Sequence, residues 1–333
     1  MHPLLRKQNS LSWMFWARTS LAICLHYTRR KGSGSDIMMN RLDIFYYNAI
    51  KTLFLFFGLM PGSWRMACGD TIGRIWFAVD KRHRKMALLN LHQAFGKEKS
   101  ELEIRRLAKR VFQNLARIPF EIAWTYRMDE ESYKKLFQIH GLSNLKTAFN
   151  RRKGVLFLTA HSGNWELLPS IVRLVGYPSL VVYRPLNFKP ADRYLYEYRV
   201  RFGVEMVTKK KSMRKIVRTL DRKECVGIVL DQNAGYTAGV FADFLGKPAS
   251  TSMGLSLAAL KYEAPVLPVF LYQEGEKFHV EIGEEIPLIK TGDKEKDVVL
   301  NTQKYNQAIE TFIRNHPDQW FWVHNRFKDQ PKP

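Results

Sequence analysis

A histidine and a glutamate five residues apart, His161 and Glu166, are the residues whose types and spacing best suit acid–base chemistry. They open and close the hexapeptide His-Ser-Gly-Asn-Trp-Glu, which directly follows the apolar run 155–160. That run contains β-branched and aromatic side chains and follows Gly154, a pattern typical of a buried strand. The strand would deliver His161 to its carboxyl end, where open α/β sheets bind ligands. The spacing therefore predicts a histidine base at the ligand-binding edge of a sheet.

Glu166 can orient the histidine only if the two residues do not share one helix. Residues five apart on a continuous helix lie about 140° apart around its axis, so their side chains would not meet. We expect His161 in a turn and a helix beginning near Asn164, with Glu166 in the first helical turn, where a carboxylate is favoured. The carboxylate would accept a hydrogen bond from one imidazole N–H and leave the other nitrogen to take a proton. The alternative is a capped loop histidine beside a solvated glutamate.

Other polar residues follow expected strands in the second half of the chain. Arg184 follows one apolar run, and Asp231 and Gln232 follow another. Because ligand crevices form outside the carboxyl ends of strands, we expect these side chains to line one site with His161. The alternatives are a surface ion pair for Arg184 and an ordinary turn for Asp231 and Gln232.

The elements that position these residues change character near residue 150. Residues 64–150 show helical periodicity, and Ser100 with Glu103 has the form of a capping box. From residue 154 apolar runs alternate with amphipathic segments, which predicts an α/β sheet layered with helices. The expected strands are 155–160, 180–183, 204–207, 226–230, 266–271 and 278–282, and the expected helices lie near 165–175, 190–201, 212–221, 252–262 and 300–315.

The N-terminal part of the chain differs in composition from the rest. Residues 1–37 end in a Gly/Ser-rich linker, and we expect an extension outside the fold. Residues 42–60 are strongly apolar and just long enough for a membrane helix, and basic clusters follow. An interfacial helix and a buried core helix are the alternatives. The expected organisation is an extension over 1–37, a membrane-anchor helix over 38–62, and a main domain over 63–330 with a helical part (63–150) and an α/β part (151–330).

The net charge points to an anionic partner. Lys and Arg number 53 against 31 Asp and Glu, which gives a formal charge of +22. Nucleic acid, an anionic membrane surface and an acidic substrate or carrier would each suit such a charge. No helix-turn-helix, zinc-finger, RNP or KH signature is present, and the apolar segment 42–60 fits a nucleic-acid-binding protein poorly. We therefore expect no nucleic-acid partner.

A family resemblance extends well beyond the hexapeptide. His161-Ser-Gly-Asn-Trp-Glu166 resembles the His-x4-Asp/Glu motif of the glycerolipid acyltransferase superfamily, and its Asn-Trp-Glu form is similar to that of the lipid A late acyltransferases, the lauroyl and myristoyl transferases. The acidic Glu-Gly-Thr-Arg-like block of the glycerol-phosphate branch is missing, which disfavours a lysophosphatidate acceptor. Further blocks resemble the lipid A branch in its order, over roughly residues 40–328, namely 90–95, 183–185, 230–233, 244–249, 264–270 and 319–328.

This resemblance implies both a fold and an activity. The implied fold is α/β, a glycerolipid-acyltransferase-like central mixed sheet flanked by helices, with an N-terminal membrane-associated helix and helical region. The implied enzyme is an O-acyltransferase that moves a fatty acyl chain from an acyl carrier protein thioester to a hydroxyl of a lipid A precursor. It would work at the cytoplasmic face of the inner membrane, with the carrier protein, the lipid A precursor and the membrane surface as partners. No metal or organic cofactor is implied.

The resemblance also implies roles for individual residues. His161 would be the general base and Glu166 its orienting carboxylate. Because no Gly-x-Ser-x-Gly elbow surrounds Ser162, we expect direct transfer without an acyl-enzyme. The oxyanion would bind backbone N–H groups near Gly163 and Asn164, or the Arg184 guanidinium. The residues expected to contact substrate are Gly163, Asn164, Arg184, Asp231 and Gln232.

Two further hypotheses remain open at the level of the sequence. In the first, the same chemistry acts on another glycolipid or lipid hydroxyl. In the second, the protein is a membrane-bound scaffold with an inactive site. The aromatic run Trp320-Phe-Trp322 either packs beneath the site or touches acyl chain, and we expect core packing.

Overall fold

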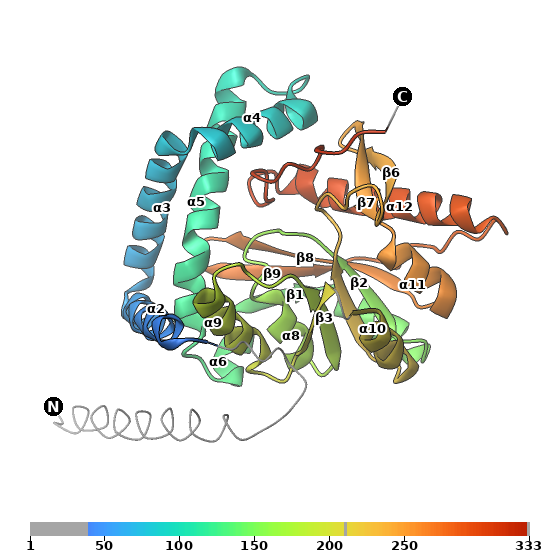
Figure 1. Ribbon diagram of the computed structural model, residues 1–333, viewed down its shortest axis with the longest axis horizontal. Helices are drawn as coiled ribbons and strands as arrows, with labels where there is room; N and C mark the ends of the chain where they lie inside the picture. Colours follow the sequence, from blue (N-terminus) through green and yellow to red (C-terminus); the bar gives the residue numbers. More distant parts are fainter. Residues whose placement is uncertain (1–38, 210–211, 332–333) are drawn as a thin grey trace. The chain divides into compact units, whose positions relative to one another are not determined.

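A seven-stranded mixed sheet organises the chain from residue 137 to residue 282 (Figure 1). The structure, a computed structural model, describes residues 39–209 and 212–331, so the extension expected over 1–37 lies outside the described residues. The strands of this sheet are β1 (Phe137–His140), β2 (Val155–Thr159), β3 (Ser179–Tyr183), β4 (Glu205–Thr208), β5 (Cys225–Val229), β8 (Val266–Glu274) and β9 (Lys277–Ile282).

The strand order is β1-β9-β8-β2-β5-β3-β4. Strands β8, β2, β5, β3 and β4 run parallel to their neighbours in that part of the sheet. Strand β9 runs antiparallel to β8 and pairs in parallel with β1. The expected mixed α/β sheet is confirmed. A separate antiparallel hairpin consists of β6 (Gly239–Phe244) and β7 (Lys247–Ser252).

Helices precede the sheet and alternate with its strands. Helices α2 to α5 come first in the described chain, and α8 to α12 follow β2. The helices are α2 (Arg41–Leu59), α3 (Gly62–Val79), α4 (Lys81–Phe95), α5 (Glu101–Thr125), α6 (Glu130–Lys134), α7 (Leu142–Asn150), α8 (Leu168–Leu174), α9 (Lys189–Val200), α10 (Ser212–Asp221), α11 (Gly254–Tyr262) and α12 (Lys294–Asn315).

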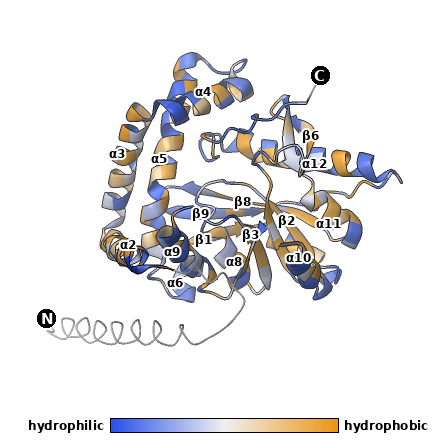
Figure 2. Ribbon diagram, viewed as in Figure 1, coloured by the Kyte–Doolittle hydropathy of each residue, from blue (hydrophilic) through white to orange (hydrophobic). Residues whose placement is uncertain are grey.

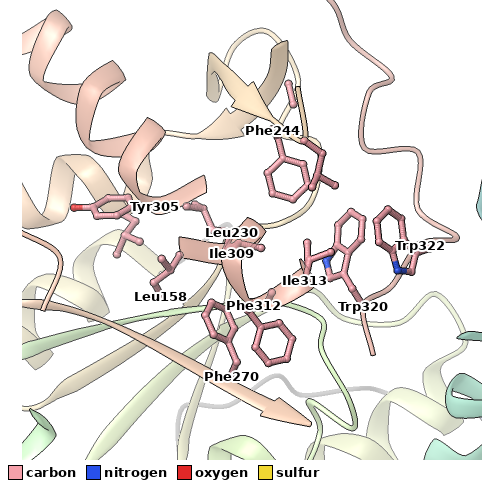
Figure 3. Packing of buried hydrophobic residues seen from close by; sticks show 14 of the residues in the cluster. Leu158, Leu230, Phe244, Phe270, Tyr305, Ile309, Phe312, Ile313, Trp320 and Trp322 are labelled. Carbon is pink, nitrogen blue, oxygen red and sulfur yellow. The ribbon is translucent and has the colours of Figure 1, made fainter. Parts of the chain in front are cut away.

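Strand β2 is buried on both faces, as parallel strands under helices are. Leu156 and Leu158 face a core cluster shared with α10, α11 and α12, whereas Val155 and Phe157 face a second cluster shared with α8 and α9. Figure 3 shows the first cluster, where side chains of α12 pack beside Leu158. The continuous apolar run before His161 therefore reflects a strand with no solvent face.

Trp320 and Trp322 belong to this first cluster and are 1% and 0% exposed. Their rings meet edge to face, with centroids 4.7 Å apart, and the Trp320 ring lies 5.5 Å from the Phe244 ring of the hairpin (Figure 3). The expected core packing of the aromatic run is confirmed at both tryptophans.

Each strand expected from the sequence is present, with ends that differ by a few residues. The capping box of Ser100 and Glu103 opens α5, and α10 matches its expected range. The helix expected from 165 is wrong at its start, because residues 165–167 form a turn and α8 begins at Leu168.

The sequence did not predict two strand pairs that the structure contains, β1 with β9 and β6 with β7. β1 lies inside the region expected to be helical, and its four residues gain a partner only when β9 returns from far along the chain. The β6–β7 hairpin turns at Leu245 and Gly246, both with positive φ (51° and 78°). A turn with two positive φ values normally carries Asn-Gly or Asp-Gly, so the Leu-Gly pair gives little signal.

The apolar segment 42–60 forms α2, and most of that helix is exposed. Only Tyr47 and Gly58 are buried, where α2 packs on α9 and α5. The Tyr47 hydroxyl donates to Glu197 Oε2 of α9 at 2.5 Å. In the described part of the chain α2 is the helix long and apolar enough to cross a membrane. Figure 2 shows apolar residues along both α2 and α3. The alternative of a buried core helix does not fit this exposure.

Candidate active site

Strand pairing places His161 beside Asp231 at the carboxyl edge of the sheet. Thr159 pairs with Val229, and the Leu230 amide donates to the Thr159 carbonyl at 3.0 Å. The chain leaves β2 toward β3 and leaves β5 toward β8, in opposite directions across the sheet. Such a switch point is where open α/β sheets form ligand crevices.

Asp231 binds His161 through both carboxylate oxygens. Oδ1 accepts a hydrogen bond from Nδ1 of His161 at 2.8 Å, and Oδ2 accepts from the backbone N–H of His161 at 3.0 Å. The indole N–H of Trp320 donates to Oδ2 at 2.7 Å. Because the carboxylate can only accept, Nδ1 carries the proton and Nε2 is left as the basic nitrogen. The Gln232 side-chain nitrogen lies 3.5 Å from Nε2.

The pair is electrostatically tuned toward a more basic imidazole. Burial opposes the imidazolium, but the charge of Asp231 and its hydrogen bond outweigh burial and raise the pKa of His161 above the ordinary 6.5. Burial likewise opposes the carboxylate, yet the contacts with His161 and Trp320 outweigh it and lower the pKa of Asp231. His161 is therefore a stronger proton acceptor than a free histidine.

Aromatic rings surround the imidazole. The Trp165 ring meets it edge to face with centroids 5.1 Å apart, and the Phe321 ring lies 5.9 Å away. The backbone N–H of Phe321 also donates to the His161 carbonyl at 3.1 Å. The His161 side chain keeps 20% of its surface exposed. The imidazole is thus mostly shielded from bulk water.

Glu166 does not have the orienting role expected from the sequence. Both of its oxygens accept hydrogen bonds from the Arg199 guanidinium of α9, each at 2.6 Å. Oε1 also accepts from the Trp165 indole at 3.0 Å. Since Asp231 accepts the hydrogen bond of Nδ1, the expected bond between His161 and Glu166 is wrong.

The start of the following helix explains this correction. Glu166 lies in the turn that precedes α8 and not in a first helical turn, so its side chain extends to α9. The Glu166 and Arg199 side chains are only 9% and 11% exposed. This buried ion pair ties the turn after β2 to α9. Burial lowers the pKa of His161 and Asp231 raises it; the charge of Glu166 makes a smaller contribution in the same direction as Asp231.

Gly163 and Asn164 hold the turn in place. Gly163 has a φ of +52°, and a Cβ there would lie 2.6 Å from the Leu271 carbonyl oxygen. Its N–H donates to the Gln319 carbonyl at 2.7 Å, so the oxyanion role expected for this amide is wrong. The Asn164 side chain points inward and donates to Glu121 Oε2 at 2.9 Å. Both residues therefore position the loop.

Arg184 and Gln232 both lie at the carboxyl edge of the sheet, after β3 and β5 respectively. Arg184 is exposed after β3, and Gln232 is partly buried beside Nε2 of His161. The structure thus brings together His161, Asp231 and Gln232, and leaves Arg184 at the rim.

Comparison with known proteins identifies the family. The family described as bacterial lipid A biosynthesis acyltransferase matches residues 36–329. The chain belongs to this family. It is 26% identical over 266 residues to the lipid A biosynthesis palmitoleoyltransferase of Escherichia coli (strain K12), with 79% of this chain and 84% of the relative covered.

Two further relatives extend the comparison. The lipid A biosynthesis lauroyltransferase of the same strain is 24% identical over 280 residues, 82% of this chain and 87% of the relative. The phosphatidylinositol mannoside acyltransferase of Mycobacterium tuberculosis (strain CDC 1551 / Oshkosh) is 24% identical over 207 residues, 59% of this chain and 63% of the relative. The resemblance of the motifs to lipid A acyltransferases is confirmed, and the chain is an acyltransferase.

Sequence reasoning missed three residues of this acyltransferase site. Trp320 carried a signal as part of an aromatic run, but nothing in the run indicated its bond to Asp231. Arg199 lies in a helix with several basic residues, and no spacing distinguished it. Glu121 lies on α5, far from the motif in the chain, and only the tertiary contact with Asn164 reveals it.

Proposed function

We propose that this acyltransferase moves a fatty acyl chain from an acyl carrier protein thioester to a hydroxyl of a lipid A precursor. His161 is the general base, and Asp231 takes the orienting role. The hydrogen bond from Nδ1 of His161 to buried Asp231, at the switch point of the sheet, carries this proposal. The named activities of the lauroyl- and palmitoleoyltransferase relatives support the acceptor. An acidic carrier suits the net charge of +22.

The reaction needs one proton acceptor and no covalent intermediate. The acceptor oxygen attacks the thioester carbonyl carbon while its proton moves to Nε2 of His161. The resulting tetrahedral oxyanion collapses, the C–S bond breaks, and the imidazolium returns the proton to the leaving thiolate. A well-placed base contributes about 10²–10⁴-fold in rate, or roughly 3–5 kcal/mol of the barrier.

The oxyanion requires a donor other than the Gly163 amide, which is occupied by Gln319. We assign this role to the Gln232 side-chain amide, whose nitrogen lies 3.5 Å from Nε2 of His161. A donor beside the base is also beside the carbonyl that the acceptor attacks. Arg184 at the rim suits the anionic groups of a substrate, and Glu166 with Arg199 keeps residues 161–167, which connect β2 to α8, in position.

The acceptor hydroxyl belongs to a membrane lipid, so the enzyme works at a bilayer. The exposed apolar side chains of α2, among them Phe45 and Phe56 at 65% and 63% exposure, suit contact with lipid. We place the enzyme at the cytoplasmic face of the inner membrane, where acyl carrier proteins and lipid A precursors meet. Because α2 packs along α5 and α9, we favour an interfacial position for it over a free spanning anchor.

A second candidate acceptor is another glycolipid. The similarity to a phosphatidylinositol mannoside acyltransferase favours this alternative, because that relative acylates a different glycolipid by its name. Base and donor would be unchanged, and only the acceptor would differ.

The test is acyl transfer from lauroyl-, myristoyl- and palmitoyl-carrier protein to a lipid A precursor. We expect product from the wild type and a loss of at least about a hundredfold in His161→Ala. His140→Ala is the matched control, since this exposed histidine of β1 lies three strands from β2. It should retain activity within about twofold of the wild type.

The outcomes separate the parts of the proposal. Transfer to a phosphatidylinositol mannoside but not to lipid A would replace the acceptor. Transfer that survives His161→Ala would remove the base. An acyl group trapped on Ser162 in a quenched reaction would replace direct attack with an acyl-enzyme.

A further inference from the structure

The connection between β3 and α9, residues 184–188, exposes apolar side chains next to α2. Leu186 and Phe188 are 46% and 49% exposed. The Phe188 ring meets the Tyr46 ring of α2 edge to face, with centroids 5.8 Å apart. The two elements form one surface, which we call the α2–loop surface and define by Leu42, Phe45, Tyr46, Leu186 and Phe188.

The connection is held in this exposed arrangement by a buried carboxylate. Asp192 is 4% exposed and accepts a hydrogen bond from the Leu186 N–H at 2.9 Å. The Asp192 N–H in turn donates to the Phe188 carbonyl at 3.0 Å. Pro185 and Pro190 fix φ on both sides. A single exposed leucine is ordinary, but two apolar side chains held outward beside an exposed helix face indicate an apolar partner.

Charges around the surface indicate what that partner is. Arg41, Arg184 and Lys189 are exposed at the borders of the surface. The nearby carboxylate of Asp43 is engaged in the capping box of α2. Apolar side chains bordered by cations suit a bilayer that contains anionic lipids, because the rings enter the acyl boundary and the cations meet headgroups.

The surface also adjoins the active-site edge. The connection leaves the carboxyl end of β3, which pairs with β5, and Asp231 follows the end of β5. A bilayer on this surface would therefore lie beside the edge that carries His161 and Asp231. The consequence for catalysis rests on the proposed function, which takes its acceptor from a membrane.

We infer that residues 184–188 and the exposed face of α2 dock together on an anionic bilayer and hold the active-site edge at its surface. The loop is thus a second membrane contact in addition to α2. It would place the edge that carries His161 and Asp231 next to the lipid acceptor.

The test measures co-sedimentation of the full chain with vesicles of phosphatidylcholine containing about 30% phosphatidylglycerol. We expect the double variant Leu186→Asp/Phe188→Asp to bind at least about tenfold more weakly than the wild type. The control is Leu102→Asp, a somewhat more exposed leucine (57%) in the first turn of α5, whereas α2 contacts the other end of that helix. It should bind as the wild type does.

A milder variant guards against misfolding of the double variant. Lys189→Glu should weaken binding to the anionic vesicles by roughly threefold or more and leave binding to pure phosphatidylcholine unchanged. The inference would be overturned if the double variant and Lys189→Glu both bound vesicles as tightly as the wild type. It would also be overturned if Leu102→Asp lost as much vesicle binding as the double variant. A wild-type dimer that the double variant converts to a monomer would overturn it as well, since the surface would then bind a second copy.

Vesicle binding needs no turnover, so it tests the inference even if the proposed acceptor is wrong. With an acceptor embedded in vesicles, the double variant should lose at least about tenfold in rate. With the same acceptor dispersed in detergent it should stay within about twofold of the wild type. Equal losses in both assays would indicate a substrate contact instead of a membrane contact.

Discussion

At the residue scale, the role proposed for Asp231 depends on its charge as well as its position. It is 1% exposed and accepts three N–H groups, two of them from His161. Its negative charge holds Nδ1 of the imidazole protonated and raises the pKa of Nε2. An amide in the same place would have a similar shape, but it would lose the charge and one of the two acceptor oxygens.

We predict that Asp231→Asn lowers kcat by roughly 10²–10⁴-fold and moves the acid limb of the pH–rate profile to lower pH. A general base acts when neutral, so activity rises as pH increases through the pKa of His161. That pKa is raised in the wild type, mainly by Asp231 acting against burial, and falls when the charge is removed. The measurement is kcat/KM against pH. An acid limb that does not move would contradict the role of Asp231.

A second prediction concerns Gly163, in the turn that follows His161. Gly163→Ala should destabilise the fold by about 1–3 kcal/mol or more, because a Cβ at φ +52° would lie 2.6 Å from the Leu271 oxygen. Gly275→Ala is the matched control, since Gly275 has a φ of +60° and nothing within 4 Å of the added Cβ. Urea unfolding of both variants isolates the steric cost. Equal losses would show that backbone strain alone requires the glycine.

Apolar runs in the sequence predict where strands end, but they do not predict which strands are neighbours in the sheet. His161 and Asp231 both follow recognisable apolar runs, so their placement at one edge was predictable. Their pairing was not, because it depends on β5 lying next to β2. Glu166 was assigned to His161 because the helix start was placed too early in the chain.

At the element scale, the Glu166–Arg199 pair fastens α9 to the turn after β2. Both side chains are nearly buried, so removing one partner leaves an uncompensated charge. We predict that Arg199→Leu costs about 3–5 kcal/mol in the free energy of unfolding. The exposed pair Glu98–Arg314, at 54% and 45% exposure, is the control and should cost about 1 kcal/mol or less.

A double-mutant cycle checks that the pair itself carries the effect. In Glu166→Gln/Arg199→Leu the combined loss should be clearly smaller than the sum of the single losses. Urea denaturation gives these free energies. Additive losses would mean that Arg199 acts through its other contacts, such as the Tyr183 ring at 5.5 Å.

Elements with a local signal were predictable, and elements made by distant pairing were not. The expected strands 155–160 and 226–230 each had a continuous apolar run, and α10 had a clear amphipathic pattern. β1 is four residues long and exists through its ladder with β9. The β6–β7 hairpin lacks the usual turn residues, so only the folded chain identifies it.

At the scale of the whole molecule, the apolar surface and the net charge indicate which partners the protein binds. The apolar side chains of α2 and of residues 184–188, with the cations at their border, suit an anionic bilayer, and the large overall excess of cations also suits an acidic donor protein. In the proposed reaction a carrier protein would deliver the thioester from water, whereas the acceptor would come from lipid. The donor would therefore depend on long-range charge attraction more than the acceptor does.

This difference gives a prediction about salt. Raising the ionic strength from about 0.05 to 0.5 M should increase KM for an acyl carrier protein donor by roughly tenfold, because screening weakens long-range attraction between a protein of charge +22 and an acidic partner. KM for an uncharged pantetheine thioester should change by less than about twofold under the same conditions. Steady-state kinetics with both donors, at fixed acceptor in detergent, makes the comparison. A salt effect of equal size on both donors would place the charge requirement on the acceptor or on catalysis. No salt effect on the carrier protein would mean that the excess charge serves the membrane and that the donor is recognised by its thioester arm.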